Sequence, residues 1–246
     1  MQVKNLPAIT ARYWSAILAA SMCGANTGDF LARNLHLGHT LGLLPLAVLF
    51  SVILWAERRA KLATEAYYWL AVIVLRTAAT NLADLATHDL KLGYGLVESG
   101  LTLLLIVILL IDFARGRSTS TGVETLGRQG SNLPATDATY WAALLTAGIL
   151  GTAIGDFTAA ALGLGYGSVI LGTIYGIVLL VSMQIGGMAK AWYWASIVAA
   201  RSAGTTMGDL LARHQGLLLS TACTGLLLAS IVVLWKDRNT APIGNA

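Results

Sequence analysis

Four aspartates recur in the same local pattern along the 246-residue chain, and they are the residues best suited to bind a ligand. Each directly follows a glycine or alanine and lies fifteen residues after a tryptophan, which itself follows a tyrosine. The aspartates are Asp29, Asp84, Asp156 and Asp209, and the tyrosine–tryptophan pairs begin at Tyr13, Tyr68, Tyr140 and Tyr193. Carboxylate oxygens are ligands for hard cations. The recurrence predicts four copies of one structural unit, each carrying one such carboxylate.

Other oxygen-bearing residues lie close to the aspartates in the sequence. Three threonines lie four residues before an aspartate, which places them on the same helix face, and two asparagines follow one position later. These residues are Thr80, Thr152 and Thr205 with Asn26 and Asn81, and Glu98 lies in the next apolar segment. No cysteine or histidine lies level with the aspartates to favour a soft metal. A divalent cation held by the four aspartates is the expected ligand, and no other cofactor is expected.

Two arginines, Arg76 and Arg201, lie eight residues before the aspartates of the second and fourth copies. A charged residue at this depth in a membrane is costly, so both are expected to face inward. We expect them to tune the charge of the site as fixed counter-ions to aspartates of neighbouring repeats. An alternative is that they hold an anionic or zwitterionic organic substrate.

The composition determines which elements carry these residues. Only 11% of residues are charged and 56% are apolar, against about 25% charged in soluble domains. Eight apolar stretches are long enough to cross a bilayer: 13–31, 40–56, 66–86, 93–111, 139–160, 166–185, 191–211 and 216–235. The sequence therefore predicts an all-α membrane protein with eight transmembrane helices. Its basic residues flank these stretches, so the net charge of +4 does not indicate nucleic-acid binding.

The positive charges predict the orientation. Eleven lysines and arginines fall on the side of the two termini and three on the opposite side, so both termini are expected in the cytoplasm of a bacterium, with the protein in its inner membrane. The repeat tryptophans fall at the cytoplasmic ends of the stretches together with Trp55 and Trp235, and we expect these six residues to form an aromatic belt.

The four copies predict four tandem parallel helical hairpins. The repeats cover residues 11–62, 65–115, 138–187 and 190–238, and they form two pseudo-symmetric halves, 1–115 and 138–238. A polar linker at 116–137 and a tail at 239–246 complete the chain. Small residues five and one before each aspartate have the spacing that lets helices approach closely. We therefore expect the odd helices to form an inner ring and the even helices an outer one.

This repeated unit, a tryptophan at the cytoplasmic edge and a small residue followed by aspartate near the helix end, resembles a bacterial repeat of unknown function. The resemblance covers nearly the whole chain. It implies a multi-pass membrane protein with four tandem two-helix repeats, and it implies no activity.

The leading functional prediction is a transporter or exporter of a small cation, a divalent metal such as Mn²⁺ or Mg²⁺, exchanging with protons. The alternatives are a passive ion channel, a transporter of a small organic substrate held by Arg76 and Arg201, and a membrane scaffold or sensor. The sensor would use the outward loop histidines His36, His39, His88 and His214. No H-E-x-x-H, P-loop or G-x-S-x-G motif is present, so an enzyme is not expected. The expected partners are the lipid bilayer and the cation, and oligomerisation stays open.

Overall fold

A computed structural model describes residues 7–60, 65–114, 136–184 and 190–235, and these residues form helices without a strand. The predicted linker and tail lie almost entirely outside them. The α-helices are α1 (Ala11–Asp29), α2 (Gly38–Leu41), α3 (Leu43–Arg59), α4 (Glu65–Asp84), α5 (Tyr94–Ala114), α6 (Ala138–Leu162), α7 (Leu164–Gln184), α8 (Lys190–Gln215) and α9 (Leu217–Leu234). Two π-helical segments, η1 (Phe30–Asn34) and η2 (Leu85–Asp89), continue α1 and α4.

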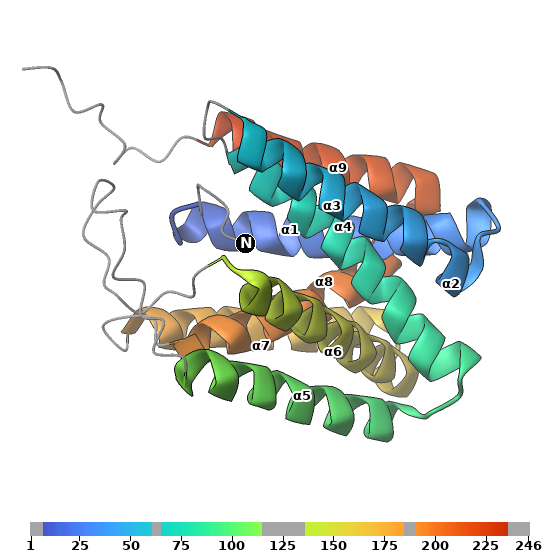
Figure 1. Cartoon of the computed structure of the whole chain (residues 1–246). Coiled ribbons are helices and arrows are strands. Elements are labelled where there is room, and N and C mark those ends of the chain that lie inside the picture. Colours follow the sequence, from blue (N-terminus) through green and yellow to red (C-terminus); the bar gives the residue numbers. More distant parts are fainter. Residues whose placement is uncertain (1–6, 61–64, 115–135, 185–189, 236–246) are drawn as a thin grey trace, which may run out of the picture.

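The four aspartate-bearing helices form a closed inner ring. Helix α1 packs against α4, α4 against α6, α6 against α8, and α8 against α1 (Figure 1). Most residues of these helices are buried, including the tyrosine and tryptophan near each N-terminal end. The ring gives each of the four aspartates an equivalent place at the same end of the bundle.

Small residues explain why these helices come so close. A Cβ atom added to Gly28 would lie 2.7 Å from the Cβ of Thr80, and one added to Gly155 would lie 3.0 Å from the Cβ of Thr205. Gly208 has the same role against Asn26, whose side-chain oxygen would lie 3.1 Å away. The i, i+4 small pairs therefore form the contacts between inner helices that the sequence predicts.

The outer helices are offset by one repeat. Helix α3 packs on α4 and α5 packs on α6, each on the inner helix of the next repeat. Helices α7 and α9 contact their own inner helix but pack more extensively on α8 and α1. The hairpin prediction is therefore wrong for the packing within the first two repeats, because α3 and α5 lie on the inner helix that follows them in the chain instead of on their own.

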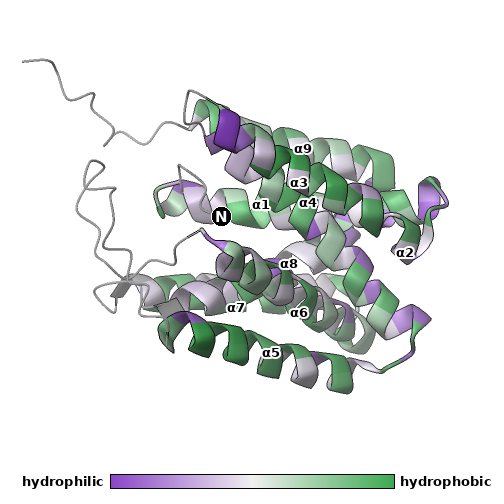
Figure 2. Cartoon of the chain, in the orientation of Figure 1, coloured by the Kyte–Doolittle hydropathy of each residue, from purple (hydrophilic) through white to green (hydrophobic). Residues whose placement is uncertain are grey.

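The outer surface is apolar. Leu44 on α3, Phe113 on α5, Val169 on α7 and Leu226 on α9 are all at least 67% exposed, and Figure 2 shows α3, α5 and α9 as mainly hydrophobic. Among the described residues, six helical segments are long and apolar enough to cross a membrane: Gly38–Arg59, Glu65–Asp89, Tyr94–Ala114, Ala138–Leu162, Leu164–Ser182 and Leu217–Leu234. Helices α1 and α8 are less apolar, since they contribute polar residues to the ring interior.

The two ends of the bundle differ. One end, called the terminal end here, holds the start of α1 and the end of α9. The opposite end, called the aspartate end, holds η1, α2, η2 and the turns after α6 and α8 (Figure 1). Each of these two turns is a single glycine, Gly163 or Gly216, with φ 83°. Only glycine adopts this φ readily, which is why the chain can reverse there in one residue.

Candidate functional site

All four aspartates line one cavity of about 200 Å³ at the aspartate end. Thr80, Thr152 and Thr205 line it one helical turn deeper, and Ala25 takes the equivalent place in the first repeat. The other lining residues are Arg33, His88, Tyr94 and Ala159. The structure therefore brings together seven of the predicted cation ligands, and His88 of the predicted loop histidines lies with them.

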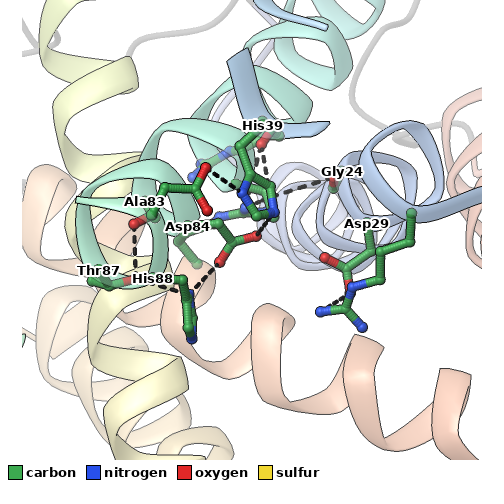
Figure 3. Close-up of polar contacts among 12 residues, drawn as sticks. Gly24, Asp29, His39, Ala83, Asp84, Thr87 and His88 are labelled. Atoms are coloured by element: carbon green, nitrogen blue, oxygen red, sulfur yellow. Dashed lines mark hydrogen bonds and ion pairs between the residues drawn. The ribbon is translucent and has the colours of Figure 1, made fainter. Parts of the chain in front are cut away.

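The two aspartates of the first half have basic partners. Asp29 lies 3.4 Å from Arg33, four residues further along the chain. Asp84 lies 3.4 Å from Nδ1 of His88 and 3.7 Å from Nε2 of His39, whose other ring nitrogen contacts Asp89 at 2.9 Å. Figure 3 shows His39 and His88 on either side of Asp84, and Asp29 on a neighbouring helix. Two of the loop histidines thus lie beside the cavity.

The two aspartates of the second half have no such partners in the described part of the chain. Four residues after Asp156, at the position equivalent to Arg33, the chain has Ala160. The Oδ2 atom of Asp156 is buried and has no hydrogen-bond partner among the described residues. Asp209 is followed by Arg213, which forms no ion pair with it. The halves also differ in backbone, because only α1 and α4 pass into a π-helical segment after the aspartate.

The carboxylates surround the cavity without converging on one point. Within the described ranges, no three His, Cys, Asp or Glu side chains are close enough to hold a metal ion together. A dehydrated ion held directly by all four aspartates therefore does not fit this conformation. The cavity fits better an ion that keeps part of its water shell, as Mg²⁺ usually does.

Three further predicted ligands do not line the cavity. Asn26 is fully buried and donates from Nδ2 to Ser220 Oγ at 2.6 Å. Asn81 is equally buried and packs against Gly28 and Gly42. Glu98 lies on α5 with one carboxylate oxygen buried. The structure places Asn26 and Asn81 between helices rather than facing the cavity.

Arg201 lies beneath the cavity and binds two of the threonines that line it. Its Nε donates to Thr152 Oγ1 at 2.9 Å, its Nη1 donates to the Ser21 carbonyl at 2.7 Å, and its Nη2 donates to Thr80 Oγ1 and to the Arg76 carbonyl. These partners lie on α6, α1 and α4, so one side chain from α8 joins all four inner helices. Among the described residues, Arg201 forms no direct ion pair with an aspartate, because its donors are occupied by neutral oxygens. Its role as a fixed counter-ion stays a prediction.

Arg76 lies deeper in the ring. It is 1% exposed, and none of its three side-chain nitrogens has a hydrogen-bond partner among the described residues. It also forms no ion pair with an aspartate there. Its electrostatic neighbours are the hydroxyls of the four repeat tyrosines, whereas those of Arg201 include Asp156, Asp209 and Asp84.

The four repeat tyrosines close the ring toward the terminal end. Their hydroxyls form a cycle of hydrogen bonds, from Tyr13 to Tyr68 at 2.8 Å, Tyr68 to Tyr140 at 2.7 Å, Tyr140 to Tyr193 at 2.8 Å, and Tyr193 back to Tyr13 at 2.7 Å. All four side chains are at most 2% exposed. We call this cycle the tyrosine square. The sequence contained its signal, a tyrosine sixteen residues before each aspartate, although its chemistry was not recognised.

The repeat tryptophans support this square instead of facing lipid. Each packs edge-on against the tyrosine that precedes it, with ring centroids 5.1–5.3 Å apart. All four are at most 7% exposed. The aromatic-belt prediction is therefore wrong for Trp14, Trp69, Trp141 and Trp194, because neighbouring helices cover the faces on which they lie. Trp55 and Trp235, at 57% and 44% exposed, remain suited to that place.

Removing one hydroxyl from the square should destabilise the protein. In Tyr68→Phe, Tyr13 and Tyr140 each lose a hydrogen bond within a buried site, which costs about 1–3 kcal/mol. Thermal unfolding in detergent should show a lower midpoint temperature. Tyr67→Phe, at the adjoining position outside the square, is the control and should leave the midpoint unchanged. Equal midpoints for the two variants would contradict a stabilising role for the cycle.

Comparison with protein families identifies the repeat. A model of the Repeat of Unknown Function DUF347 matches residues 12–62, 67–118 and 192–239, which together make up more than half of the chain. The chain belongs to this family. The matches correspond to the first, second and fourth repeats, and residues 138–187 carry the same tyrosine, tryptophan, glycine and aspartate pattern outside the matched segments. No curated protein and no solved structure matches the chain.

Proposed function

We propose that the protein is a membrane transporter of a small cation, with the aspartate-lined cavity as the binding site. The observation that carries this proposal is the gathering of four acidic side chains around one cavity within a ring of helices. Mn²⁺ and Mg²⁺ are the first candidates, bound with part of their water shell and exchanged for protons. Carboxylates in the interior of a membrane bundle typically mark ion pathways and proton relays.

The asymmetry along the ring axis supports a carrier. The cavity is lined by acids at the aspartate end, and the tyrosine square closes the terminal end about 24 Å away, since sixteen helical residues separate the two layers. Such an arrangement suits a conformation open to one side. Movement of one half against the other would open the square and close the cavity, as in other transporters built from repeats.

The buried arginines favour this proposal over a passive cation channel. Arg201 lies across the axis directly below the cavity, and Arg76 lies between it and the tyrosines. Fixed positive charge on a pore axis excludes cations. A cation would therefore cross this layer only when the arginines move, which couples its passage to a conformational change.

The proposed topology has eight membrane spans, with both termini in the cytoplasm of a bacterium and the chain in its inner membrane. Helices α1 and α8 fall short of the hydropathy of the other spans, but α9 covers α1 and α7 covers α8. Their polar residues can thus face the ring interior rather than lipid. The excess of basic residues at the terminal end supports the orientation.

The experiment is uptake into proteoliposomes that contain the purified protein. Mn²⁺, Mg²⁺, Ca²⁺ and Zn²⁺ are offered in turn, and a pH-sensitive dye inside the vesicles records proton movement. We expect saturable uptake of at least one ion with protons moving in the opposite direction. Asp112→Asn, which removes an acid outside the cavity, is the control and should transport normally. Uptake no greater than in protein-free vesicles for every ion would refute the proposal.

A further inference from the structure

Several buried polar atoms of the inner helices have no hydrogen-bond partner among the described residues, and two of these groups lie at neighbouring levels of the ring. One is the guanidinium of Arg76 on α4, and the other is Oγ1 of Thr205 on α8. An unpaired charge in a membrane interior is costly. We therefore expect the Arg76 side chain to adopt further conformations in which it has partners. Thr205 lines the cavity beside the aspartates.

The pseudo-symmetry of the two halves indicates where Arg76 can go. Arg201 crosses the ring from α8 to α4 and binds Thr80, which lies four residues after Arg76. The equivalent crossing, from α4 to α8, brings Arg76 to Thr205, which lies four residues after Arg201. Arg201 also donates to the carbonyl of Ser21. The equivalent acceptor for Arg76 in the other half is the carbonyl of Gly148.

Glycine at position 148 keeps this route open. A Cβ atom there would lie 3.7 Å from Nη1 of Arg76 and 2.9 Å from the Cβ of Ala79. A side chain there would therefore collide with Ala79 and come into van der Waals contact with the guanidinium. If Arg76 adopts the side-chain conformation that Arg201 already has, it reaches a second set of partners, Thr205 and the carbonyl of Gly148.

The distribution of charge around the cavity indicates why Arg76 would move. Asp29 and Asp84 have basic neighbours, whereas Asp156 and Asp209 have none within hydrogen-bonding distance among the described residues. One guanidinium, that of Arg201, lies beneath these two unpaired carboxylates. When the cavity holds no cation, a second positive charge is needed to balance them.

We propose that Arg76 is a tethered counter-ion, which moves to Thr205 and neutralises the second-half aspartates whenever the transported cation is absent. It acts as a positioning residue in the transport cycle, and it allows the empty carrier to change conformation. With cation bound, Arg76 returns to the place below Arg201. This inference rests on the proposed function.

The role predicts different effects on two kinds of transport. Net uptake requires the empty carrier to return, whereas exchange of internal for external ion does not. With the first of Mn²⁺, Mg²⁺, Ca²⁺ or Zn²⁺ that the wild type transports, Arg76→Gln should reduce net uptake at least tenfold and leave exchange within twofold. Arg76→Lys should restore part of the net uptake, since it retains the charge. Thr205→Val should also reduce net uptake, and Thr146→Val, a buried threonine of α6 away from the cavity, is its matched control and should not.

The outcomes separate this inference from the function on which it rests. Wild-type vesicles that transport none of the four ions would overturn the proposed function and the inference with it. Transport by the wild type, with net uptake and exchange reduced equally in Arg76→Gln, would overturn the inference alone. The titrated affinity of detergent-purified Arg76→Gln for the same ion serves as the check on folding. An affinity within twofold of the wild type, together with the selective loss of net uptake, would support the inference.

Discussion

Asp156→Asn combined with Asp209→Asn should abolish saturable cation uptake, with a loss of affinity of about 1,000-fold or more. Removing a buried charged partner typically costs about 2–5 kcal/mol, and about 1.4 kcal/mol corresponds to a factor of ten. The loss of two such carboxylates therefore lowers the binding free energy by about 4 kcal/mol or more, which leaves the affinity too weak to measure. Calorimetric titration of the purified variant, alongside vesicle uptake, measures both effects.

The matched control is the same double substitution in the first half, Asp29→Asn with Asp84→Asn. Arg33 lies beside one of these carboxylates, and His39 and His88 lie beside the other, so part of their charge is already balanced in the empty site. We expect the first-half variant to bind more weakly than the wild type but far more tightly than the second-half variant. Identical affinities for the two double variants would show that the four aspartates contribute equally.

Gly151→Val should strongly destabilise the protein. Its Cβ atom would lie 2.6 Å from the Cβ and 2.7 Å from the Cγ of Arg201, and 3.0 Å from the carbonyl oxygen of Val198. Backbone and the base of a side chain cannot move aside independently, so α8 must shift away from α6. Overpacking of this kind costs about 1–3 kcal/mol or more, and here it also displaces the residue that lies beneath the cavity.

Gly176→Val on α7 is the control, because nothing lies within 4 Å of an added Cβ there. Thermal unfolding and size-exclusion profiles in detergent should show a clear loss for Gly151→Val and none for Gly176→Val. A Gly151→Val protein with the wild-type midpoint would mean that the α6–α8 contact is looser than described.

Much of the arrangement could be predicted from recurrence. The aspartates, threonines and small pairs occupy the same positions in each repeat, and equivalent positions in tandem repeats occupy equivalent places in space. This is why Asp29 and Asp156, 127 residues apart in the sequence, line one cavity. The tyrosines followed the same rule, and their burial together could have been inferred from it.

Features that depend on which neighbour covers which face could not be predicted in this way. Hydropathy gives the length of a helix but not its partner, so the one-repeat offset of α3 and α5 was missed. For the same reason, Trp69 at a helix end is predicted to be an interfacial residue, whereas it is buried and packs on Tyr13 of α1. The contact of Asp84 with His88 follows from helical spacing, but its contact with His39 joins two repeats and depends on where α2 lies.

The packing of α9 on α1 has a consequence for biosynthesis. Translation produces α1 first and α9 last, yet the two cover each other in the finished bundle. Until the last helix is made, one face of the first remains without its protein neighbour, and α1 is among the less apolar helices of the chain. The outer face of α1 is therefore covered only once α9 has been made, so a ribosome that stalls before α9 leaves that face of the ring in contact with lipid.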